Sequence, residues 1–183
     1  MRKTAARTLL IDNHDSYTYN LFQLIAEENG VPPLVVRNDD YGGDWSRAAA
    51  ALAGCYDCIV ISPGPGNPTV AGDFGMCAAV LKCATVPVLG VCLGHQGLGI
   101  AFGAAVVHAP SGPMHGRLSL VHHDGEDELW RGVPSPISVV RYHSLVIDAA
   151  TLPPSLVPLA WSVEDRVLMS VRTALFILHI VYD

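Results

Sequence analysis

The chain has 183 residues, half of them hydrophobic, a length that suffices for one domain around a single core. Its formal net charge is −6 at pH 7, and the eleven Lys and Arg residues are scattered along the sequence, so we expect no nucleic-acid partner. No apolar run approaches the roughly 20 residues that a membrane-spanning helix requires, so no membrane segment is expected.

The beginning of the chain and its cysteines bear on the compartment. The first seven residues are basic, but a strand-like run begins at Thr8 and leaves no room for a signal or transit peptide. The five cysteines are an odd number without a secretory segment, which favours reduced thiols over a disulfide framework. We therefore expect a cytoplasmic protein, or a plastid one if the chain comes from a plant or alga.

Short apolar runs alternate with helical patterns in the first half of the chain. Thr8–Asp12 predicts a strand, and the apolar residues from Leu21 to Ile25 recur at helical spacing before Gly30. Leu34–Arg37 predicts a second strand. The chain is therefore expected to open with a strand, a loop, a helix and another strand.

The same order repeats downstream. Trp45–Leu52 predicts an alanine-rich helix, Tyr56–Ser62 a buried strand and Pro63–Pro68 a loop. Phe74–Lys82 predicts a further helix, and Pro87–Val91 a fourth strand. Strands that alternate with helices in this way imply parallel pairing with right-handed crossovers. The expected fold class is α/β, with a doubly wound and mostly parallel sheet.

The pattern changes after Ala104, where short stretches of alternating apolar residues are separated by turns. This half of the chain is expected to add an antiparallel or mixed part to the parallel sheet. The strands predicted in it are Val106–His108, Arg117–His123, Ser138–His143, Leu156–Trp161 and Val167–Val171.

Cys92 directly follows the fourth predicted strand, within the run Gly90-Val91-Cys92-Leu93-Gly94. This run has the G-x-nucleophile-x-G form of a nucleophile elbow, whose small flanking residues permit a strained turn that points the side chain into solvent. The amino end of a helix beginning near Gly94 would favour the nucleophilic thiolate, which a free cysteine of pKa ~8.5 supplies only in small amounts. The alternative is that Cys92 is one more buried core cysteine.

The loop Gly64-Pro65-Gly66 follows a neighbouring strand, at the sheet edge where doubly wound folds carry their sites. Its amides can turn toward an oxyanion formed when Cys92 attacks a carbonyl group, and each such donor contributes roughly 10² to 10³ in rate. A phosphate cradle is the rival interpretation. The run from Gly64 to Pro68 matches neither a dinucleotide-binding fingerprint nor a P-loop, so we favour the oxyanion site.

The other cysteines carry weaker signals. Cys55 and Cys58 form a single C-x-x-C, which could be a redox pair or half of a zinc site. Because the sequence has no second pair and Cys58 enters an apolar strand, a structural role is favoured. Cys77 and Cys83 are expected within a helix and at its end, with no sign of a partner.

Two motifs together resemble those of the class I (triad) glutamine amidotransferases: SPGPGNP at Ser62–Pro68 and GVCLGHQ at Gly90–Gln96. The resemblance continues in LLIDNHDSYTYNLFQ near the start, in MHGRLS at Met114–Ser119 and in VVRYHSLVID at Val139–Asp148. It covers nearly the whole chain, from about Thr8 to Val171. It implies a flavodoxin-like class I glutamine amidotransferase fold.

The resemblance also implies a chemistry. Cys92 would attack the side-chain amide of glutamine, form a glutamyl thioester and release ammonia. Gly64 and Gly66, with the backbone amide of Leu93, would form the oxyanion hole and the backbone cradle. Gln96, one turn into the following helix, would hold the substrate. The resemblance implies no metal ion and no organic cofactor.

The resemblance assigns the far wall of the pocket and a partner as well. The backbone of Ser144 and Leu145 would bind the amino acid end of glutamine, and His143 would belong to this wall rather than act as the base. The ammonia would pass to a chorismate-binding synthase domain or subunit. The segments around Gly30–Asp39 and Arg117 look more like those of aminodeoxychorismate synthase in folate biosynthesis. The glutaminase subunit of anthranilate synthase, in tryptophan biosynthesis, is the alternative.

The end of the sequence departs from the resemblance. Family members continue past the strand at Val167 to a His-Pro-Glu-Ser segment, which supplies the base and the glutamate that orients it. This sequence contains no His-Pro-Glu, and His179, flanked by apolar residues, receives no role as the base. We expect residues 1–172 to form an incomplete amidotransferase domain and residues 173–183 a divergent hydrophobic tail. Within it, Ala174–Val181 would form an edge strand or promote aggregation.

Two functional hypotheses follow from this departure. The first is glutamine hydrolysis impaired by loss of the catalytic His and Glu, since a general base contributes roughly 10² to 10⁴ in rate. The second is a non-catalytic module that keeps the glutamine pocket and the face for the partner. The intact Cys92, Gly64, Gly66 and Gln96 favour descent from a working enzyme.

Overall fold

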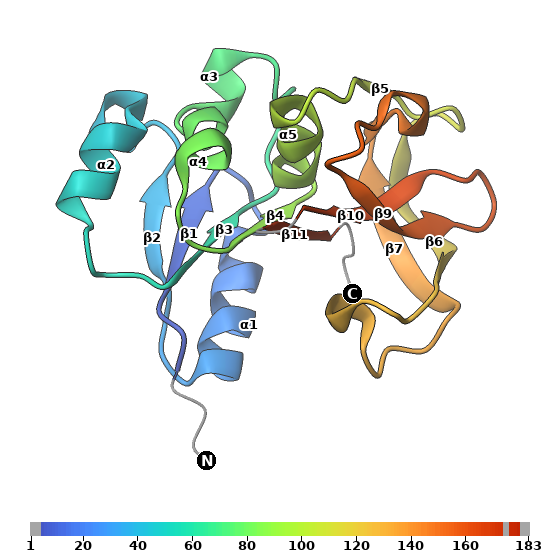
Figure 1. Cartoon of the computed structure of the whole chain (residues 1–183), viewed down its shortest axis with the longest axis horizontal. Coiled ribbons are helices and arrows are strands. Elements are labelled where there is room, and N and C mark those ends of the chain that lie inside the picture. Colours follow the sequence, from blue (N-terminus) through green and yellow to red (C-terminus); the bar gives the residue numbers. More distant parts are fainter. Residues whose placement is uncertain (1–4, 174–175, 180–183) are drawn as a thin grey trace.

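A computed structural model describes residues 5–173 and the backbone of residues 176–179. Within this part, a nine-stranded sheet has the order β2-β1-β3-β4-β11-β10-β9-β6-β7 (Figure 1). Its parallel strands are β1 (Thr8–Asp12), β2 (Leu34–Arg37), β3 (Cys58–Ile61), β4 (Val88–Val91) and β11 (Phe176–His179). Its antiparallel strands are β6 (Met114–His123), β7 (Ile137–His143), β9 (Val157–Ser162) and β10 (Leu168–Arg172). A separate antiparallel pair consists of β5 (Val106–His108) and β8 (Leu145–Ile147).

Helices cover both faces of the parallel strands, with α1 on one face and α2, α4 and α5 on the other (Figure 1). Their bounds are α1 (Thr18–Asn29), α2 (Trp45–Ala51), α3 (Ala71–Phe74), α4 (Cys77–Cys83) and α5 (Leu93–Ala101). Three 3₁₀ turns are η1 (Asp40–Gly43), η2 (Glu128–Trp130) and η3 (Ala149–Thr151). Over the described ranges, every helix is too short or too polar to cross a membrane.

Strand β1 explains how this layered arrangement is held together. Successive side chains of a strand point to opposite faces of the sheet. Leu9 and Ile11 are fully buried in the larger core cluster, which includes Trp45 of α2. Leu10 is also fully buried, but in a second cluster with Val91 and the apolar side chains of α1. A strand buried on both faces therefore reads as the continuous apolar run seen in the sequence.

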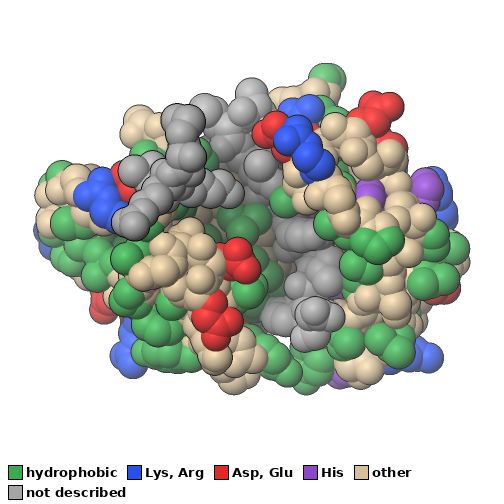
Figure 2. Space-filling model, turned by 90° about the horizontal axis from the view of Figure 1, so that it is seen from below, with side chains coloured by type: hydrophobic (Ala, Val, Ile, Leu, Met, Phe, Trp, Pro, Cys, Tyr) green, Lys and Arg blue, Asp and Glu red, His purple; other side chains and the backbone are tan. Residues whose placement is uncertain are grey.

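The surface agrees with the scattered charges of the sequence. On the face shown in Figure 2, the described Lys and Arg side chains lie in separate places and form no continuous basic patch. A protein that binds nucleic acid through its backbone phosphates usually gathers such side chains on one face.

The predicted α/β class, with a parallel sheet and an added antiparallel part, is confirmed. The single helix predicted over Phe74–Lys82 is wrong. Helix α3 ends at Phe74, because the backbone of Gly75 (φ 48°, ψ −133°) leaves the helical region, and α4 begins only at Cys77. Strand β8 is missing from the sequence prediction, in which the preceding strand ended at His143 and the next began at Leu156.

The described part of the tail also differs from the expectation. Strand β11 is not an edge strand, because it lies inside the sheet between β4 and β10. It runs parallel to β4 and antiparallel to β10. In this register His179 is the Cα partner of Val91, the residue that precedes Cys92. The backbone of β11 thus joins the parallel and antiparallel parts of the sheet.

Candidate active site

Cys92 forms the turn between strand β4 and helix α5. Its backbone (φ 51°, ψ −99°) lies in a region that residues with a side chain rarely adopt. Helix α5 begins at the next residue, Leu93. The strand, strained turn and helix predicted from the elbow motif are therefore confirmed. The expectation that the side chain points into solvent is wrong, since Cys92 is only 8% exposed and faces a pocket.

The pocket has a volume of about 500 Å³ and lies where the parallel strands meet the antiparallel part. Three walls come from the loop after β1, the loop after β3 and the elbow, and a fourth comes from the β6–β7 hairpin with the segment that follows it. The lining residues are Asp15, Ser16, Tyr17, Pro63, Gly64, Pro65, Gly66, Cys92, Gln96, His115, Gly116, Val140, Tyr142, His143, Ser144 and Leu145.

The structure brings nearly all predicted site residues together around this pocket. Cys92, Gly64 and Gly66 line one side, and Gln96 lines it from α5. Ser144 and Leu145 line it from the segment after β7. Leu93 differs, because its side chain is buried in the core. Its backbone N–H bonds to the Cys92 sulfur and lowers the pKa of that thiol, so the predicted role of its amide is geometrically possible.

The glycines of the loop after β3 are required by close approach. A Cβ on Gly64 would lie 2.5 Å from Cβ of Asn13 and 2.7 Å from Cδ2 of Leu93, shorter than atoms in contact allow. Gly66 has φ +86°, and a Cβ there would lie 2.1 Å from Oδ2 of Asp73. The same Asp73 oxygen accepts a hydrogen bond from the Asn67 amide at 2.9 Å. The loop is therefore packed tightly against its supports on both sides.

Asn13 is a supporting residue that sequence reasoning missed. Its backbone N–H donates to Oγ of Ser62 and its Nδ2 donates to the Ser62 carbonyl, both at 2.9 Å. Nδ2 of Asn38 in turn donates to Oδ1 of Asn13 at 3.0 Å. These buried side chains fix the start of the glycine loop. Their place in the sequence could have identified them, since Asn13 and Asn38 directly follow strands β1 and β2, at the sheet edge where such folds carry their sites.

Gln96 links α5 to the opposite wall. Its Nε2 donates to the Leu145 carbonyl at 3.1 Å, and its side chain is buried. One end of this amide is therefore committed to the protein. Gln96 sets the position of the Ser144–Leu145 backbone as well as lining the pocket itself.

His143 lines the pocket but is unsuited to accept a proton. The Nε–H of Arg141 donates to Nε2 of His143 at 3.1 Å, so the lone pair of that nitrogen is already used. Burial and, next, the positive charge of Arg141 lower the pKa of His143 to about 4. The imidazole is therefore neutral at pH 7. This agrees with its predicted place in the wall rather than as the base.

The expectation that the amino end of α5 would favour the thiolate form of Cys92 is wrong. Burial, and then the negative charge of Asp15, raise the pKa of the Cys92 thiol to about 11, although the Leu93 amide acts in the opposite direction. The start of α5 therefore does not outweigh the loss of water around the sulfur. Cys92 rests as a neutral thiol at pH 7, and its reaction requires that the proton be removed during attack.

The remaining cysteines fit structural roles. Cys55 is exposed. Cys58 lies at the start of β3, and its Sγ is 3.4 Å from Oγ1 of Thr8. Cys77 is buried in α4 beside Asn13, and Cys83 is exposed at the end of that helix. Among the described residues, no group of three or more His, Cys, Asp or Glu is placed to hold a metal ion.

Comparison with known families accounts for this arrangement. The sequence model of the family "Glutamine amidotransferase class-I" matches residues 9–175. The chain belongs to this family. The glycine loop and the cysteine elbow lie within the matched residues.

Relatives of this amidotransferase chain include proteins named aminodeoxychorismate synthase and anthranilate synthase component 2. It is 52% identical over 165 residues to the chloroplastic aminodeoxychorismate synthase of Arabidopsis thaliana, covering 87% of this chain but 18% of that protein. It is 42% identical over 169 residues to anthranilate synthase component 2 of Methanothermobacter marburgensis, covering 90% of this chain and 82% of that one. The chain thus spans about a fifth of the first relative's length.

Solved structures support the fold of this amidotransferase. A putative GMP synthase protein from Thermoplasma acidophilum superposes with a TM-score of 0.78 at 23% identity. The match covers 97% of this chain and 84% of that one. At this level of identity the similarity establishes the shared fold.

The raised pKa of Cys92 gives a testable pH dependence for this amidotransferase. Only the thiolate reacts with iodoacetamide, so the alkylation rate of Cys92 should rise about tenfold per pH unit from pH 7 toward its pKa of about 11. Site-resolved mass spectrometry of the alkylated chain measures this rate. Replacing Asp15 by asparagine should shift the profile to lower pH, because a negative charge that opposes the thiolate is removed. A plateau reached below pH 9 in the unchanged chain would contradict the burial argument.

Proposed function

We propose that this chain hydrolyses the side-chain amide of glutamine through a thioester on Cys92. The observation that carries the proposal is the position of Cys92 in a strained elbow that faces a pocket of about 500 Å³, on the side that the Gly64–Gly66 loop also lines. The sulfur bonds to the amide carbon, the carbon–nitrogen bond breaks, and ammonia leaves with the proton lost by the thiol. Water then replaces the sulfur, which yields glutamate and restores the thiol.

The pocket offers distinct partners for the two ends of glutamine. The amides of the Gly64–Gly66 loop and of Leu93 would stabilise the negative charge that forms on the oxygen of the attacked amide group, where preorganised donors are most effective. The backbone of Ser144 and Leu145, held by Gln96, would bind the amino acid end. This division leaves the reacting carbon beside Cys92.

The proposed reaction needs a base that accepts the proton of Cys92. His143 is a poor candidate, since Arg141 occupies its acceptor nitrogen. A thiol with a pKa near 11 needs a proton acceptor close to it.

Replacing His179 by alanine tests the impairment predicted from the absent His-Pro-Glu. A chain without a base is slow already, so the variant should release ammonia from glutamine at the rate of the unchanged chain. A rate about 10² to 10⁴ times lower in the variant would contradict the predicted impairment.

We propose that a chorismate-binding synthase domain or subunit receives the ammonia. The chain is 52% identical to an aminodeoxychorismate synthase and 42% identical to an anthranilate synthase component. This difference supports a role in folate biosynthesis over one in tryptophan biosynthesis. Ammonia transfer to each kind of synthase, with chorismate present, tests the preference by the product formed. We assign the chain to the cytoplasm, or to the plastid if it comes from a plant or alga, as the chloroplastic relative supports.

Labelling with a diazoketone analogue of glutamine tests the proposed function most directly. The analogue should attach to Cys92 alone among the five cysteines, and free glutamine should protect it. Ammonia release is then measured on the same sample. Labelling of several cysteines without protection would contradict a glutamine pocket, whereas protected labelling without ammonia release would support the non-catalytic module.

A further inference from the structure

A buried ion pair lies behind the wall of the pocket. Arg141 of β7 is fully buried, and Asp165 lies in the turn between β9 and β10 with a side chain that is 14% exposed. Nη1 and Nη2 of Arg141 donate to the two carboxylate oxygens of Asp165, each at 3.0 Å. Two parallel bonds of this kind fix the plane of the guanidinium group.

The surroundings of Asp165 are built to keep it charged. The hydroxyl groups of Ser111 and Ser162 both donate to its carboxylate, in addition to Arg141. Burial by itself would raise the pKa of Asp165, but these hydrogen bonds hold it well below its usual value. Removing two charges from water is costly, and apolar side chains of the same volume are often as stable. Stability alone therefore does not explain why a buried ion pair occupies this position.

Arg141 also contacts a residue of the pocket, through its Nε–H group. Its Nε–H donates to Nε2 of His143, which assigns the neutral tautomer with the proton on Nδ1. His143 lines the pocket and is followed by Ser144 and Leu145, which line it too. The Leu145 carbonyl then accepts the hydrogen bond of Gln96 from α5. A continuous chain of contacts thus runs from the β9–β10 turn to the helix that follows Cys92.

We propose that the Arg141–Asp165 pair positions the substrate-binding wall at His143–Leu145, and thereby sets the affinity for glutamine without touching it. This inference rests on the proposed function, since it assigns a cause to glutamine binding at the same pocket. Arg141 and Asp165 lie outside the lining of the pocket, so they act through His143. They are therefore positioning residues. The thiol of Cys92 lies on a different wall of the pocket from His143–Leu145.

The test replaces Asp165 by asparagine, which keeps the shape and removes the charge. Labelling of Cys92 is measured against the concentration of the diazoketone glutamine analogue, which separates the binding constant from the maximal rate. The binding constant should weaken at least about tenfold, while alkylation by iodoacetamide, which needs no wall, should change less than about twofold. Equal changes in both would indicate general loosening and would overturn the proposal.

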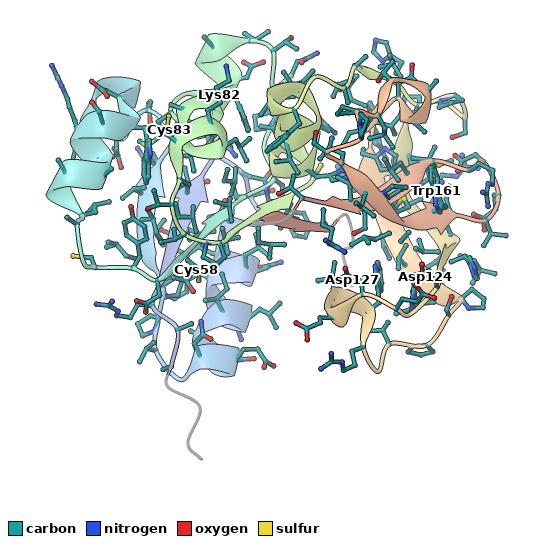
Figure 3. All side chains as sticks on the ribbon, in the orientation of Figure 1. Cys58, Lys82, Cys83, Asp124, Asp127 and Trp161 are labelled. Atoms are coloured by element: carbon teal, nitrogen blue, oxygen red, sulfur yellow. The ribbon has the colours of Figure 1, made fainter. Side chains whose placement is uncertain are left out.

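Asp127→Asn is the matched control. Asp127 pairs with Arg172 and is 11% exposed, close to the value for Asp165, but it lies in the loop at η2 outside the pocket lining (Figure 3). This variant should bind the analogue like the unchanged chain. If it weakens binding as much as Asp165→Asn does, the effect belongs to ion-pair loss in general and the proposal fails.

A milder variant covers the case in which Asp165→Asn does not fold. Ser111→Ala removes one of the donors to Asp165 and keeps the pair with Arg141, so binding should weaken about threefold. An unchanged binding constant in a folded variant would overturn the positioning role while leaving the proposed function intact. A failure of the unchanged chain to show saturable, glutamine-protected labelling would overturn the proposed function, and this inference with it.

Discussion

Replacing Cys92 by serine is expected to lower the turnover number for glutamine by at least about 10³-fold. The hydroxyl group is far less acidic than the thiol, and no thioester can form. Serine is close in size to cysteine, so the elbow between β4 and α5 should keep its backbone. Ammonia release under saturating glutamine measures the effect.

The control for this change is Cys83→Ser. Cys83 is exposed at the end of α4 and lies outside the pocket lining, so the variant should release ammonia at the rate of the unchanged chain. Retention of more than about a tenth of the activity by Cys92→Ser would mean that another group forms the covalent bond. The assignment of Cys92 as nucleophile would then be wrong.

Replacing Gly64 by alanine should reduce turnover by roughly 10² to 10³-fold, the loss typical of a missing oxyanion donor. The new Cβ would lie 2.5 Å from Cβ of Asn13 and 2.7 Å from Cδ2 of Leu93, so the loop must move away. Asn13 is held by its bonds to Ser62 and cannot yield easily. The loop amides would then no longer face the oxygen of the amide group that Cys92 attacks.

Gly72→Ala is the matched control for the glycine loop. Gly72 lies a few residues downstream in α3, and a Cβ there meets no atom within 4 Å. Its turnover should equal that of the unchanged chain. If Gly64→Ala keeps full turnover in a folded protein, the loop does not supply the oxyanion donors. Iodoacetamide alkylation of Cys92 should continue in both variants, because it does not depend on the loop.

The sequence alone determined the features that depend on short segments. The run Gly90–Gly94 predicted a strand, a strained turn at Cys92 and a helix, because the small residues of this turn are needed locally. The apolar runs of β1 and β3 predicted buried parallel strands. Parallel strands carry their loops to one edge of the sheet, so the meeting of the Gly64–Gly66 loop with Cys92 could also be expected.

Only the tertiary structure decided the features that depend on contacts between distant segments. The pKa of Cys92 rises because burial outweighs the start of α5, and burial cannot be read from a motif. His143 is neutral because burial and, next, the positive charge of Arg141 lower its pKa, and Arg141 is held by Asp165, 24 positions later in the chain. The place of β11 between β4 and β10 follows from pairing across the sheet. Local patterns fix local geometry, whereas desolvation and hydrogen-bond partners arise only when the chain has folded.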